Sequence, residues 1–151
     1  MSRLVCLSLM LMLVVCLVAV AESKPQEANR EEQMAEAANE CKAETGATDE
    51  DVELMMKHEP SGNQEGKCLR ACMMKKFKIM EEDGKLNIEH TLGMLKVMSE
   101  HAEDKEDVLT EVVETCAASD VTEDHCESAQ AYQTCIFEHM QKHGIPLIEE
   151  H

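Results

Sequence analysis

The sequence predicts an all-α domain held together by three disulfides. Apolar residues recur at helical spacing from Met34 onward, and no run of alternating β-branched residues predicts a strand. Six cysteines follow a hydrophobic leader, and an even number of cysteines in a secreted chain indicates a disulfide framework. We therefore expect one domain of five to seven helices.

The first 21 residues have the layout of a secretory signal peptide. A basic head ends at Arg3, residues 4–21 carry no charge, and Ala19-Val20-Ala21 forms a small-residue cleavage site before polar sequence begins. We expect residues 1–21 to be removed and residues 22–151 to form the mature domain. An uncleaved membrane anchor is the alternative, because the apolar run approaches the length that spans a bilayer.

The charge of the mature chain excludes several classes of protein. Its 130 residues hold 13 Lys and Arg against 31 Asp and Glu, a net charge of −18. Such a domain repels nucleic acids and anionic membranes. The nucleophile-elbow, zinc-protease and P-loop motifs are missing, so we predict no catalytic residues, no enzyme activity and no cofactor. The cysteine spacing contains no C-x-x-C pair, so we predict no metal site.

The six mature cysteines cannot pair in every combination. Cys68 and Cys72 lie four residues apart in one helical stretch, with Cβ atoms about 5–6 Å apart, whereas a disulfide needs about 3.5–4.5 Å. Cys126 and Cys135 share another helical stretch and lie about 13.5 Å apart along its axis. Both exclusions leave most connectivities open. The remaining two cysteines of the mature chain are Cys41 and Cys116.

The N-terminal part of the mature chain predicts an arm and two helices. Residues 22–28 are polar and include a proline, so we expect a loose arm. A helical stripe then runs from Met34 to Cys41 and ends at Gly46. Thr48 is a good N-cap for a second, short helix, because three acidic residues follow it where the helix dipole favours negative charge.

The remaining apolar stripes predict four more helices, at residues 65–80, 87–99, 104–119 and 122–144. Thr122 is the expected N-cap of the last one. Gly93 lies inside a predicted helix, where glycine costs about 1 kcal/mol against alanine, and it suggests close packing at that point.

The cysteine spacing resembles that of a known family. It reads C-x26-C-x3-C-x43-C-x9-C-x8-C, and the C-x3-C and C-x8-C gaps are the most specific parts. With a signal peptide, six helical stretches and the run Gly66-Lys67-Cys68-Leu69-Arg70-Ala71-Cys72, the chain resembles the insect odorant-binding proteins. The match is to the six-cysteine subgroup of pheromone and general odorant-binding proteins, over Met34 to Phe137. The 43-residue gap is at the long end for the family and indicates a small extension between His90 and Asp107.

The resemblance implies a compact six-helix fold around a hydrophobic cavity, and a carrier that takes odorants or pheromones through extracellular fluid such as sensillar lymph. It implies the bridges Cys41–Cys72, Cys68–Cys126 and Cys116–Cys135. The expected partners are a small hydrophobic ligand and an olfactory receptor surface, with the chain a monomer or weak dimer. The alternatives are a non-olfactory lipid or toxin carrier and a partner-binding protein with a filled core, both on the same scaffold.

The candidate ligand-binding residues are the apolar positions of the helical stripes: Leu69, Met73, Phe77, Leu92, Leu95, Met98, Val112, Val113, Tyr132, Ile136 and Phe137. Nine methionines against three aromatic residues in the mature chain favour a soft, adaptable site. The Tyr132 hydroxyl either binds a polar group of the ligand or reaches solvent.

The C-terminal segment after Gly144 keeps large aliphatic residues, including Leu147 and Ile148, which a frayed tail seldom does. We expect residues 145–151 to pack back on the domain, and a lid over the pocket is the alternative. His139, His143 and His151 lie at this end and form a hypothetical pH switch, against the simpler interpretation of solvated surface histidines.

Overall fold

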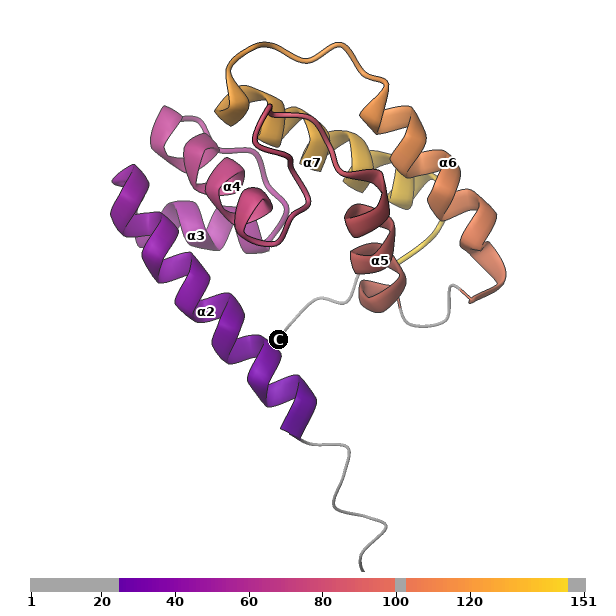
Figure 1. The fold of residues 1–151 in the computed structure, drawn as a ribbon, viewed down its shortest axis with the longest axis horizontal. Helices are drawn as coiled ribbons and strands as arrows, with labels where there is room; N and C mark the ends of the chain where they lie inside the picture. Colours follow the sequence, from indigo (N-terminus) through magenta and orange to yellow (C-terminus); the bar gives the residue numbers. More distant parts are fainter. Residues whose placement is uncertain (1–24, 100–102, 147–151) are drawn as a thin grey trace, which may run out of the picture. The chain divides into compact units, whose positions relative to one another are not determined.

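The computed structural model describes residues 25–99 and 103–146. These ranges contain the α-helices α2 (Pro25–Thr45), α3 (Asp49–Met56), α4 (Gln64–Lys76), α5 (Ile88–Met98), α6 (Glu106–Ala117) and α7 (His125–Lys142), and a short 3-10 helix, η1 (Glu103–Lys105) (Figure 1). Their only β pairing is an isolated antiparallel bridge between Met80 and Leu86. The all-α prediction is confirmed. The predicted signal peptide and the end of the tail, residues 147–151, lie outside the described residues.

The chain divides into two units after Glu36, within α2. The described part of the first unit is helical from Pro25, so the expectation of a loose arm is wrong for residues 25–28. Proline is well tolerated at the first helical position, where its missing N–H group has no intrahelical partner to lose. Glutamine, glutamate and alanine follow it, and all three favour helix.

The second unit begins with Ala37 and contains α3 to α7. Thr48 caps α3 as predicted: its hydroxyl oxygen accepts from the Asp51 N–H at 3.3 Å, and the Asp51 carboxylate accepts from the Thr48 N–H at 2.8 Å. This reciprocal pair satisfies two backbone donors of the first turn.

The predicted cap of the last helix is wrong. Asp124 caps α7, and its carboxylate accepts from the N–H groups of Cys126 and Glu127. The Thr122 hydroxyl instead donates to the Asp124 carbonyl oxygen at 3.2 Å. A carboxylate next to the positive end of the helix dipole is a stronger acceptor than a hydroxyl two residues further away.

Helix α4 ends four residues earlier than predicted. Lys78 adopts a left-handed conformation with φ 57°, and the Ile79 N–H bonds the Met74 carbonyl at 2.7 Å. A left-handed residue with such a hydrogen bond terminates the helix. The chain then reverses through Gly84, which has φ 84°, and Met80 pairs with Leu86. Met80 is therefore buried as part of the turn after α4, and not as part of the predicted helix.

Three disulfides join the helices of the second unit. They are Cys41–Cys72 between α2 and α4, Cys68–Cys126 between α4 and α7, and Cys116–Cys135 between α6 and α7. These are the three pairs that the family resemblance implies. Helix α4 is thereby bonded to a neighbour on each side.

A buried arginine connects α4 to the loop before it and to α7. Arg70 is 1% exposed, and its guanidinium donates to Gln133 Oε1 at 2.7 Å, to Ser61 Oγ at 3.2 Å and to the Glu59 carbonyl. Burial lowers the pKa of this guanidinium, and the charge of Asp51 opposes that shift. Together with Asn63 and Gln130 these residues form the Arg70 network, in which Asn63 bonds Asp51 at 2.9 Å and Gln130 accepts from the Ser61 N–H at 2.7 Å.

Gly66 lies where the Arg70 network leaves no room for a side chain. A Cβ atom there would be 2.5 Å from both Asp51 Oδ1 and Ser61 Oγ. The close packing expected at Gly93 is not found, because a Cβ atom there meets nothing within 4 Å.

We predict opposite effects for two glycine substitutions. Gly66→Ala should lower the free energy of unfolding by about 1–3 kcal/mol, because the new methyl group pushes apart Asp51 and Ser61. Gly93→Ala should raise it by about 0.5–1 kcal/mol, because alanine favours an open helical position. Urea titration of the two variants measures both effects. Equal changes in the free energy of unfolding would contradict the close packing at Gly66.

The capping box makes part of the stability pH-dependent. The backbone hydrogen bond from Thr48 is the largest influence on the pKa of Asp51, and that pKa is lowered despite burial. A lowered pKa means that the stabilisation is complete above the ordinary aspartate pKa and is lost as the pH falls through the folded-state value.

Asp51→Asn should therefore lower the free energy of unfolding by about 1–2 kcal/mol at pH 7. The difference from wild type should shrink in acid, where the wild-type carboxylate takes a proton. Urea titrations from pH 7 down to about pH 2 measure this. Glu50→Gln, which removes an exposed carboxylate from the same helical turn, is the control and should stay within about 0.5 kcal/mol. A constant difference across the pH range would refute the linkage.

Candidate functional site

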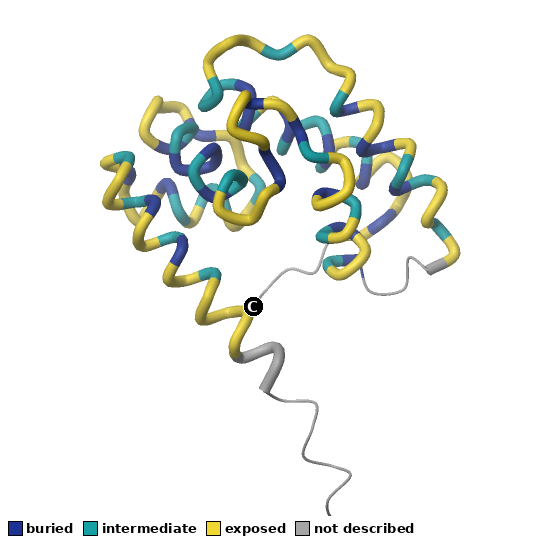
Figure 2. The backbone as a smooth tube through the Cα atoms, viewed as in Figure 1, coloured by how far each residue is buried: buried dark blue, intermediate teal, exposed yellow. Residues whose placement is uncertain are grey.

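Six of the predicted ligand-binding residues meet in the apolar interior formed by α5, α6 and α7. Leu95, Val112, Val113, Tyr132 and Ile136 are buried there, and Leu92 packs against them. Figure 2 marks the buried positions along these helices. The same cluster, called here the apolar cluster, also contains Ala71, Ile79, Met80, Leu86, Leu109, Cys116, Ala129, Met140 and Ile145.

Other predicted residues lie elsewhere. Leu69 and Met73 are buried on α4 but are not members of the apolar cluster. Phe77 is 37% exposed, because α4 has ended at Lys76 and the chain turns away. Phe137 is half-buried and stacks on the His58 ring, with centroids 5.1 Å apart, and Met98 is half-buried near the end of α5.

Several members of the apolar cluster were missed as site residues. Met80 and Leu86 enter it from the two sides of the turn at Gly84, and apolar residues flanking an Asp-Gly pair are the signal in the sequence. Ile145 is 4% exposed, and its N–H bonds the Met140 carbonyl at 3.0 Å. The chain thus packs back on the domain at Ile145, while Leu147 and Ile148 lie outside the described residues.

Tyr132 is the member of the apolar cluster with an oxygen in its side chain. The residue is 1% exposed. Lys85, in the turn after α4, pairs with Asp83, with Nζ and Oδ2 3.0 Å apart, and that hydrogen bond is the main reason that the pKa of Lys85 is raised. Thr91 is also buried, but its hydroxyl donates to the Asn87 carbonyl at 2.6 Å.

The histidines proposed as a pH switch lie at the end of α7. His139 is half-buried, and His143 is exposed and terminates the helix. Lys105 bonds the carbonyls of His143 and Gly144 at 3.5 and 3.3 Å, which neutralises part of the negative helix end. His151 lies outside the described residues, so the switch stays a prediction.

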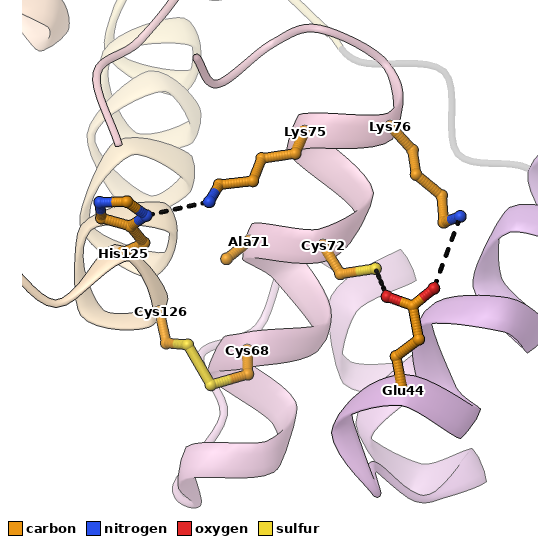
Figure 3. Close-up of a pocket in the computed structure, with 8 residues that line it drawn as sticks. All are labelled: Glu44, Cys68, Ala71, Cys72, Lys75, Lys76, His125 and Cys126. Carbon is orange, nitrogen blue, oxygen red and sulfur yellow. Dashed lines mark hydrogen bonds and ion pairs between the residues drawn. A yellow bond between two sulfur atoms is a disulfide. The ribbon is translucent and has the colours of Figure 1, made fainter. Parts of the chain in front are cut away.

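A pocket of about 460 Å³ opens on the surface beside two disulfides. Its lining residues are Glu44, Cys68, Ala71, Cys72, Lys75, Lys76, His125 and Cys126 (Figure 3). Lys75 Nζ lies 2.9 Å from His125 Nδ1, across the groove between α4 and α7. Sequence reasoning missed this site. The available signal was the helical spacing of Cys68, Ala71 and Lys75, which puts all three on one face of α4.

Across residues 25–99 and 103–146, no helix is long and apolar enough to cross a membrane. The same ranges contain no group of three histidine, cysteine or acidic residues arranged to hold a metal ion.

Comparison with known proteins decides the family. Residues 23–139 match the PBP/GOBP family. General odorant-binding protein 19d of Drosophila melanogaster is 52% identical over 151 residues, covering 100% of both chains.

The chain belongs to the PBP/GOBP family.

Further relatives and solved structures are similar to this chain. General odorant-binding protein 28a of Drosophila melanogaster is 42% identical over 110 residues, 73% of this chain and 77% of that protein. The solved structure of odorant-binding protein dmelOBP28a from Drosophila melanogaster superposes with a TM-score of 0.72 at 39% identity, covering 80% of this chain and 100% of that one. Apis mellifera odorant binding protein 5, at 19% identity and a TM-score of 0.59, shares the fold over 74% of this chain and 88% of its own. The resemblance drawn from the cysteine spacing is confirmed.

Proposed function

We propose that this protein is a secreted carrier that binds small hydrophobic molecules, odorants or pheromones, in its apolar interior and moves them through aqueous extracellular fluid. The observation that carries the proposal is the full-length similarity to a general odorant-binding protein. The apolar cluster of α5, α6 and α7 supplies the physical basis, because the apolar surface of a ligand that enters it leaves water.

The expected affinity follows from the area that a small volatile buries. About 250 Å² of apolar surface at about 25 cal/mol per Å² gives about 6 kcal/mol before the cost of association, which supports micromolar binding at best. Met80 and Met140 are members of the apolar cluster, and Met74 and Met94 pack against it. Methionine adapts its shape readily, so the wall should accept ligands of varied outline.

The remaining parts of the proposal concern processing and partners. We infer cleavage after Ala21, a mature domain of residues 22–151, a monomer or weak dimer, contact with an olfactory receptor surface and no catalytic activity. A non-olfactory carrier of lipids or toxins, or a partner-binding protein with a filled core, is the alternative on the same scaffold.

The deciding experiment is a titration of oxidised residues 22–151 with an apolar fluorescent probe. We expect saturable one-to-one binding that small volatiles displace. Val113→Phe, which adds a larger side chain inside the apolar cluster, should lower the affinity for the probe about tenfold, whereas Val97→Phe at a position 48% exposed should leave that affinity unchanged. Repeating the titration at pH 5 addresses the histidine switch. If folded wild-type protein binds no probe, the carrier proposal is wrong and the partner-binding alternative takes its place.

Tyr132 should select ligands that carry a hydrogen-bonding group. Tyr132→Phe should lower the affinity for an aliphatic alcohol by about two- to tenfold, because it removes one hydrogen bond and little volume. The affinity for the alkane of equal length should stay unchanged. Probe displacement by each compound measures the two ratios. Equal losses for both compounds would show that the hydroxyl takes no part, and a thermal melt checks that the variant is folded.

A further inference from the structure

The surface pocket beside α4 combines charged side chains with an apolar floor. Lys75 and His125 lie on one side of it, while Lys76 and Glu44 lie on the other (Figure 3). Ala71, which is 5% exposed, and the Cys68–Cys126 bridge lie between and below them. A ligand in this pocket would meet charge at the rim and apolar atoms at the base.

Lys75 is a cation without a carboxylate partner among the described residues. Its recorded contact is with His125 Nδ1 at 2.9 Å. Because the ammonium group only donates, that ring nitrogen is the acceptor in this contact. An imidazole ring carries no negative charge, so the contact leaves the positive charge of Lys75 uncompensated, in a chain whose net charge is −17.

The carboxylates near the pocket already have donors. Glu40 and Glu44 lie 2.7 and 3.8 Å from Lys76 Nζ, and Asp83 lies 3.0 Å from Lys85 Nζ. Asp124 accepts from the first N–H groups of α7 and from Gln64 at 3.0 Å. Lys75 is therefore left to bind an anion that enters from outside.

Glu44 makes the far side of the pocket less favourable for a second anion. Glu44 Oε2 lies 3.6 Å from Cys72 Sγ, a contact and not a hydrogen bond, because a disulfide sulfur carries no hydrogen. Its negative charge would repel a dianion or a second carboxylate. The arrangement favours one negative group at Lys75, with the rest of the ligand apolar.

We propose that this pocket binds an aliphatic monocarboxylate. Its carboxylate accepts from Lys75 Nζ beside His125, and its alkyl chain lies on Ala71 and the Cys68–Cys126 bridge. The volume, about 460 Å³, is within the usual range for small-molecule sites. Ala71 belongs both to this site and to the apolar cluster, but Lys75 and His125 lie outside the cluster, so the proposal does not depend on the carrier function.

The test is an NMR titration of oxidised residues 22–151 with octanoate, following the His125 ring resonances, which reports weak binding as well as strong. Lys75→Gln should weaken octanoate about tenfold or more, because a charge-assisted hydrogen bond is lost. Lys142→Gln removes an equal charge from the exposed end of α7 and should change the affinity less than about twofold. Octanol should shift the His125 ring little in any variant.

The outcomes separate this proposal from the carrier function. Octanoate should bind protein already saturated with the apolar fluorescent probe, at unchanged affinity. Equal octanoate affinities in Lys75→Gln and Lys142→Gln would place the carboxylate elsewhere and overturn the proposal. If the probe fails to bind while octanoate binds in a Lys75-dependent way, the carrier proposal fails and the surface site stands. Backbone spectra of each variant verify folding.

Discussion

Helix α4 is bonded on both sides, and much of the second unit depends on that constraint. Cys72 attaches it to α2 and Cys68 attaches it to α7, one helical turn apart. The beginning of α4 lies so close to Asp51 and Ser61 that only glycine fits at Gly66. The same constraint brings His125 to the face of α4 that carries Lys75. Covalent geometry therefore shapes the surface pocket as well as the core.

The Arg70 network shows how a small domain tolerates a buried charge. Taking a guanidinium out of water is expensive unless its donors are satisfied. Here a side-chain amide, a hydroxyl and a backbone carbonyl accept from its two terminal nitrogens, and the nearby Asp51 supplies opposite charge. The Nε donor has no partner in the described part of the protein. The network thus connects α3, α4, α7 and their loop through polar contacts, and the apolar cluster occupies a different side of α7.

The sequence predicted the features that depend on residues close together along the chain. The helical stripes and the Thr48 cap depend on neighbours in sequence, and both were predictable. The left-handed turn at Lys78 was not, because lysine has no special preference for it and the closure depends on the packing of Met80 and Leu86. The split of the predicted site residues has the same origin: Phe77 is exposed because α4 ended early. The surface pocket depends on how α7 lies against α4, which the helical periodicity of each segment does not specify.

The order of the three bridges along the chain has a consequence for proteolysis. The bonded pairs 41–72, 68–126 and 116–135 overlap end to end, so every peptide bond from Cys41 to Cys135 lies inside at least one covalent loop. A protease that cuts this stretch once nicks the chain without releasing a fragment. The two ends of the cut remain tethered, and the helices stay within reach of their native contacts. Such a nicked protein would migrate as an intact chain until its disulfides are reduced.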